Sequence, residues 1–103
     1  MTTTPVPKVG DRYVVLTPFT CGVLVHWRAP ATYGYDKELP AGLEFVIDYE
    51  PPESATAVSA LAEPYEKWER VLVNEEDRAE KKYDGYHLVI HFKDLKQNCG
   101  RLS

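Results

Sequence analysis

The sequence lacks an excess of basic residues. Its 12 lysines and arginines are outnumbered by 16 aspartates and glutamates, which gives a formal net charge of −4 at pH 7. A protein that binds nucleic-acid phosphates needs a basic face, so we expect no nucleic-acid partner. The sequence also lacks an apolar run near the ~20 residues that a membrane helix needs, and residues 1–8 lack the apolar segment of a signal peptide. We therefore expect no membrane partner and a cytoplasmic location.

Cysteine is scarce, and the motifs of common enzymes are missing. The 2 cysteines, Cys21 and Cys99, show no C-x-x-C spacing and have no histidine beside them at ligand spacing. We predict two reduced thiols rather than a bridge, because cytosolic proteins rarely keep disulfides. A P-loop, a dinucleotide fingerprint and a nucleophile motif are also missing. We therefore predict no cofactor, no metal and no catalytic residue. The missing motifs favour a protein that is not an enzyme.

The length of 103 residues fits one domain. Residues 1–9 are rich in threonine and proline and are expected to form a flexible N-terminal arm. Residues 10–99 are expected to form a single β-rich domain, followed by a tail at residues 100–103. The 2 tryptophans, 7 tyrosines and 3 phenylalanines suit a compact β core.

Alternation of apolar and polar residues predicts most of the strands. The clearest case is residues 39–49, where a Pro-Ala-Gly turn precedes Leu43, Phe45, Ile47 and Tyr49 on one face. The same signal predicts strands over residues 12–18, 20–28, 55–62 and 86–92. Residues 29–41 between them are predicted to be a loop, and a loop of this length is often functional.

One helix stands out, over residues 64–73. A proline opens it, and Tyr65, Trp68 and Leu72 form an apolar stripe at helical spacing. The densely charged residues 74–82 either extend this helix or form a solvated loop. Residues 93–98 are predicted to form a short helical turn.

These elements predict a mainly β (β-rich α+β) fold of about five strands, curled into a partly open barrel with one amphipathic helix. The strand faces converge on a core of ten residues: Tyr13, Val15, Val23, Val25, Phe45, Ile47, Trp68, Leu72, Leu88 and Ile90.

Two resemblances add to this prediction. Residues 31–47 contain a Tyr-Gly-Tyr run, then Glu-Leu, then a glycine-containing turn and a strand, and they resemble the start of an SH3 domain; residues 92–95 resemble the short helical turn before its last strand. This resemblance implies a small SH3-like barrel. Residues 17–20, 39–46, 51–59 and 83–90 together resemble small uncharacterised bacterial proteins, some of which are carried on integron gene cassettes. That resemblance implies a soluble bacterial protein of unknown function, with no activity to carry over.

The three histidines, His26, His87 and His91, are the candidates for metal or acid–base chemistry. His87 and His91 are four residues apart on a predicted strand, which separates them by roughly 13 Å and is too far for one metal ion. The sequence does not fix whether His26 approaches either of them. The alternative is that all three lie on a solvated sheet face.

Four residues are predicted to bind a partner: Tyr33, Tyr35, Arg28 and Lys37. Both tyrosines lie in the predicted loop, where an exposed tyrosine supplies contact area at low entropic cost. The alternative is that the tyrosines fold back over the barrel mouth.

The leading functional hypothesis is therefore a small protein- or peptide-binding (adaptor) module, with self-association as a homo-oligomer as one form of it. The alternative hypothesis is a small-molecule-binding protein or hydrolase, with a pocket at the barrel mouth that uses one of the histidines.

Overall fold

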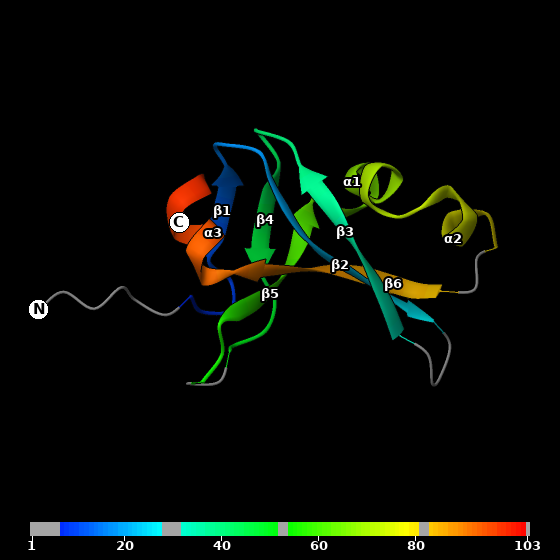
Figure 1. Cartoon of the computed structure of the whole chain (residues 1–103), viewed down its shortest axis with the longest axis horizontal. Helices are drawn as coiled ribbons and strands as arrows, with labels where there is room; N and C mark the ends of the chain where they lie inside the picture. The colour runs from blue at the N-terminus through cyan, green and yellow to red at the C-terminus, as the bar shows by residue number, and fades with distance from the viewer. Residues whose placement is uncertain (1–6, 28–31, 52–53, 81–82, 103) are drawn as a thin grey trace, which may run out of the picture.

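An antiparallel sheet forms the centre of the computed structural model, which describes residues 7–27, 32–51, 54–80 and 83–102. The sheet has seven strands in the order β3-β2-β6-β5-β4-β1-β7. They are β1 (Arg12–Val15), β2 (Phe19–Trp27), β3 (Thr32–Leu39), β4 (Glu44–Ile47), β5 (Ala57–Glu63), β6 (Tyr83–His91) and β7 (Cys99–Arg101). The outer strands β3 and β7 each pair on one side, so the sheet is open. Figure 1 shows β2 and β6 running along the long axis of the molecule, with β1 and β4 crossing that direction.

Three helices accompany the described strands: α1 (Tyr65–Leu72), α2 (Glu75–Glu80) and α3 (Phe92–Asn98). Figure 1 shows α1 and α2 following one another at one end of the molecule and α3 beside β1 at the other. Leu72 of α1 and Leu95 of α3 are buried in the core, and Trp68 packs against it. None of the helices in the described ranges is long and apolar enough to cross a membrane.

The two faces of the sheet differ in burial because side chains alternate along each strand. One face carries the core, in which Val23 and Val25 of β2, Leu88 of β6 and Phe45 of β4 are all fully buried. Helices α1 and α3 pack their apolar side chains on this core. The other face, here called the open face, is made of side chains that are only partly buried: Val14, Leu24, His26, Val46, Ser59, Leu61, His87 and Val89.

The turn before β4 has the geometry that its sequence predicts. Gly42 has a φ of +95°, which favours glycine. Its N–H donates to the carbonyl of Val15 at 2.8 Å, and the N–H of Leu43 donates to the carbonyl of Pro40 at 3.3 Å. These hydrogen bonds fix the start of β4 beside β1.

The prediction of a mainly β fold is confirmed, but two finer expectations are wrong. The sheet has seven strands rather than about five, and it is open rather than curled into a barrel. The main cause is residues 29–41, which we predicted as a loop although β3 occupies Thr32–Leu39. Because β3 is an edge strand that pairs on one side, it needs fewer apolar side chains than a central strand, and its apolar signal is weak.

Most of the predicted core is confirmed. Nine of the ten residues are buried and Trp68 is partly buried. Tyr49 was expected on the core face of its strand, and this is wrong, since it is 66% exposed and lies after the end of β4. The charged segment left open as helix or loop contains α2. Residues 100 and 101 of the expected tail pair with β1 as part of β7, and residues 1–6 of the expected arm lie outside the described residues.

Candidate binding surface

The edge of the sheet at β3 is the first part of the candidate surface. β3 pairs with β2 along its whole length, from Phe19 opposite Leu39 to His26 opposite Thr32. No other strand in the described residues pairs with it. The opposite edge differs, because β7 has only three residues. Long unprotected edges are templates for pairing with another chain, whereas short edges are not.

The backbone groups of β3 that point outward follow from the alternation of hydrogen bonds across β6 and β2. The starting point is the hydroxyl of Tyr65, which bonds to the backbone of Tyr86 in β6. It accepts a hydrogen bond from the N–H of Tyr86 at 2.8 Å and donates one to the carbonyl of the same residue at 3.3 Å. The N–H and C=O of one residue in an antiparallel strand point to the same side. Tyr86 therefore turns both groups away from β2. Val25 lies opposite Tyr86 but makes no backbone hydrogen bond with it, so the N–H and C=O of Val25 point toward β3.

The alternation continues across β2 into β3. Tyr33, Tyr35 and Lys37 lie opposite Val25, Val23 and Cys21, so their backbone groups form the ladder with β2. The residues between them, Gly34, Asp36 and Glu38, therefore turn their N–H and C=O groups to the free edge. Asp36 and Glu38 are exposed, which makes this edge acidic.

The open face continues from this edge into an apolar centre. Leu24 lies over Gly34, where a Cβ atom would be 2.5 Å from the Cδ2 atom of Leu24, so any larger residue would require that leucine to move. Val89, Leu61 and Val46 follow on the next strands, each partly exposed.

Acidic side chains flank the apolar centre on both sides. Asp36 and Glu38 flank it on β3, and Glu44 does so on β4, where it is exposed. The nearest cation on β1, Arg12, is paired with Glu63 at 2.8 Å. The surface as a whole is therefore apolar at its centre and negative at its rim.

Two histidines meet on the open face. Nε2 of His26 lies 2.6 Å from Nδ1 of His87, so one ring donates and the other accepts. The ring centroids are 4.5 Å apart and the ring planes differ by 25°. Burial lowers the pKa of His87, the nearby His26 lowers it further, and Asp48 opposes both effects. This shift favours a neutral His87 at pH 7.

Of the four predicted partner-binding residues, the structure assigns Tyr35 an internal contact. Its hydroxyl accepts a hydrogen bond from the N–H of Asn74 at 2.8 Å and donates one to Oδ2 of Asp77 at 3.3 Å. Asp77 is only 5% exposed. Burial is the main cause that raises the pKa of Tyr35. This tyrosine therefore ties the junction of α1 and α2 to β3.

The other three predicted residues are described less fully. Lys37 places Nζ 5.3 Å from the ring centroid of Tyr35. The backbone of Tyr33 lies in β3 opposite Val25, while its side chain and the whole of Arg28 lie outside the described residues.

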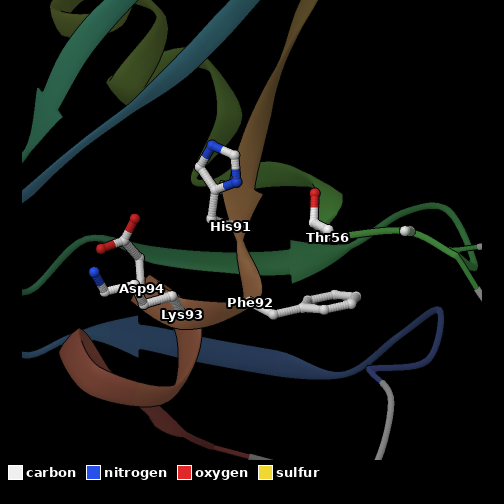
Figure 2. A pocket seen from close by; sticks show the side chains of 6 residues that line it. Thr56, His91, Phe92, Lys93 and Asp94 are labelled. Carbon is white, nitrogen blue, oxygen red and sulfur yellow. The ribbon is translucent and has the colours of Figure 1, made fainter.

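A shallow pocket lies at the third histidine, where β6 meets α3. It is lined by Ala55, Thr56, His91, Phe92, Lys93 and Asp94. Figure 2 shows His91 and Phe92 pointing in different directions, with Lys93 and Asp94 together on the first turn of α3. This pocket is formed by residues other than the histidine pair, so the three histidines divide between two places.

The cysteines show no sign of redox or nucleophilic chemistry. Both are free thiols, Cys21 buried and Cys99 half-buried. Burial raises the pKa of each to about 12, so thiolate is rare at neutral pH. In the described ranges no three His, Cys, Asp or Glu side chains gather as ligands for a metal ion.

Sequence reasoning missed the acidic edge formed by Asp36 and Glu38. The signal was present as the alternation of residues 32–39, but the polar composition led to a loop prediction. Comparison of the chain with protein-family models, with curated proteins and with solved structures found no match. The function therefore has to be argued from the geometry of this surface.

Proposed function

We propose that the protein is a binding module that adds an extended, cationic segment of a protein partner to the free edge of β3. The observation that carries this proposal is the length of that edge. β3 has eight residues paired on one side only, and Gly34, Asp36 and Glu38 turn their backbone groups outward. Strand addition to an exposed edge is a recurring mode of peptide recognition, in which main-chain hydrogen bonds give affinity.

The side chains beside the edge supply specificity. In strand addition, alternate residues of the added segment lie on each face of the enlarged sheet. On the open face they meet the acidic pair Asp36 and Glu38, and on the opposite face they meet Tyr35 and Lys37, which alternate with that pair along β3. A segment that alternates lysine or arginine with apolar residues fits both faces. Its cations lie beside the two carboxylates, where opposite charges across neighbouring strands contribute roughly 0.2–1 kcal/mol per pair, and its apolar residues lie beside the ring of Tyr35.

A cationic partner fits this edge better than a second copy of the chain. If two copies pair antiparallel with the two-fold axis at Asp36, the two Asp36 carboxylates lie directly opposite, which is destabilising. The net charge of −4 adds a general repulsion between copies. Self-association is therefore an outcome that the test below distinguishes, rather than the form we favour.

The test is selection of binders from a display library of random decapeptides against the folded protein. We expect the selected peptides to alternate apolar and basic residues, and their binding to weaken at least about tenfold in Asp36→Pro, which removes an outward N–H. The matched control is Asp36→Asn, which keeps the N–H and should lose only the charge effect. Selected peptides that bind Asp36→Pro as well as the wild type would overturn the proposal, as would a library in which nothing is enriched.

A second function, small-molecule binding, is supported by the pocket at His91. Its lining combines an imidazole, an aromatic ring, a lysine and a carboxylate, and small-molecule sites commonly combine apolar walls with a few polar groups. The hydrolase form of this hypothesis remains a prediction from the sequence. A fragment screen by NMR tests the binding, with shifts expected at Thr56 and Asp94 that disappear in His91→Ala; shifts elsewhere would contradict it. The SH3-like resemblance likewise remains a prediction, and the proposed edge does not depend on it.

A further inference from the structure

We propose that His26 and His87 form a two-histidine site for a divalent transition-metal ion, with Cu²⁺ the best fit, on the open face of the sheet. The site is separate from the edge of β3 and does not depend on the proposed function. It rests on the meeting of two ring nitrogens from strands far apart in the sequence.

The sheet itself holds the two ligands together. In the ladder between β2 and β6, Leu24 lies opposite His87 and His26 lies opposite Gly85, so the histidines are diagonal neighbours on one face. Nε2 of His26 and Nδ1 of His87 are 2.6 Å apart. Imidazole nitrogens are among the commonest ligands for zinc, copper and nickel. Because the backbone ladder fixes both Cα positions, a metal ion meets two donors that are already close together.

The separation of the two nitrogens favours an angle of about 90° between the metal–nitrogen bonds. Two nitrogens bound at about 2.0–2.1 Å lie about 2.9 Å apart at a 90° angle and about 3.3 Å apart at a tetrahedral angle. The observed 2.6 Å is nearer the first value. To bind at neighbouring positions of a tetragonal ion, the two nitrogens therefore have to move apart less than for a tetrahedral ion. Each ring also has to rotate so that the lone pair of its nitrogen points toward solvent. Tetragonal geometry is typical of Cu²⁺ and Ni²⁺, and Cu²⁺ binds most tightly in the general order of affinities.

The surroundings allow the ion to enter and favour its charge. Both histidines are half-buried rather than enclosed, so water completes the coordination. Asp48 is near enough to act on His87 electrostatically, which favours a cation there. No third protein ligand joins the pair within the described ranges. Among the described residues the site offers a metal ion two protein ligands, and with water as its other ligands the ion should exchange readily.

The experiment is titration of the metal-stripped protein with Cu²⁺ by calorimetry in a non-coordinating buffer, with His26→Ala, His87→Ala and the matched control His91→Ala. We expect one Cu²⁺ per chain in the wild type and in His91→Ala, and at least about tenfold weaker binding in the other two variants. Zn²⁺ should bind more weakly than Cu²⁺. A wild type that binds no Cu²⁺, or one whose binding is unchanged in His26→Ala and His87→Ala, overturns the proposal.

A second measurement keeps the test valid if a variant fails to fold. Cu²⁺ is paramagnetic and broadens the NMR signals of nearby nuclei, so substoichiometric Cu²⁺ in the wild-type protein should broaden the amides of Leu24, Gly85 and His87 first. Broadening centred on His91, or on the N-terminus, would assign the ion to another place and overturn the proposal.

Discussion

Removal of one hydroxyl, in Tyr35→Phe, tests the internal role that the structure gives to this tyrosine. The hydroxyl satisfies the N–H of Asn74 at 2.8 Å and donates a longer bond of 3.3 Å to Asp77. The N–H of Asn74 is only partly buried, so its loss costs about the 0.5–1.5 kcal/mol of a typical intramolecular hydrogen bond rather than the larger penalty of a fully buried one. The longer bond adds little, because Asp77 has further interactions. We therefore expect the free energy of unfolding to fall by about 0.5–1.5 kcal/mol.

Urea unfolding followed by tryptophan fluorescence measures this change, with Tyr49→Phe as the matched control. Tyr49 is 66% exposed, and exposed substitutions usually change stability by less than about 0.5 kcal/mol. A loss of 1 kcal/mol in a domain of this size lowers Tm by roughly 4–8 °C. Equal stabilities for Tyr35→Phe and Tyr49→Phe would refute the role of the Tyr35 hydroxyl in joining β3 to the helices.

Four further predictions concern the backbone and the thiols. Gly85→Ala should destabilise by at least about 1 kcal/mol in urea, because φ is +154° and the new Cβ would lie 2.8 Å from the hydroxyl of the tyrosine that begins α1; a smaller loss would contradict that crowding. Lys37→Pro should cost at least about 1 kcal/mol more than Asp36→Pro, because the N–H of Lys37 belongs to the ladder and that of Asp36 points outward; equal losses would show that the assignment is wrong. With a pKa of about 12, Cys21 and Cys99 should react with iodoacetamide at pH 8 about 10³-fold more slowly than an exposed thiol of pKa about 8.5. Since these pKa values are raised on folding, the thiols stabilise the fold below pH about 9 and that contribution falls as the pH rises further; stability that rises between pH 9 and 11 would contradict it.

The strands with one buried face were predictable from sequence, and the edge strand was not. Leu43, Phe45 and Ile47 alternate with Glu44, Val46 and Asp48, and each of the first three is buried as the pattern requires. In β3 the same face contains Tyr35, Lys37 and Leu39, of which only Leu39 is buried and the other two are half-buried. An edge strand makes one ladder and buries less surface, so its apolar signal is too weak to outweigh the adjoining prolines and glycine.

The sequence pattern also did not predict which distant strands pair with each other. His26 and His87 are 61 residues apart in the chain, and they meet because β2 and β6 are neighbours in the sheet. Alternation assigns each histidine to a face of its strand, but it carries no information on strand order. The histidine pair therefore follows from topology, whereas the acidic edge follows from a pattern that is visible in the sequence once β3 is recognised as a strand.

Amide hydrogen exchange along β3, with and without a selected cationic peptide, tests the proposed edge addition most directly. In the free protein we expect fast exchange at Gly34, Asp36 and Glu38 and slow exchange at Tyr35 and Lys37, whose N–H groups bond to β2. With the peptide bound, the three outward amides should become protected by at least about tenfold. Unchanged exchange at these three amides in the saturated complex would contradict strand addition at this edge.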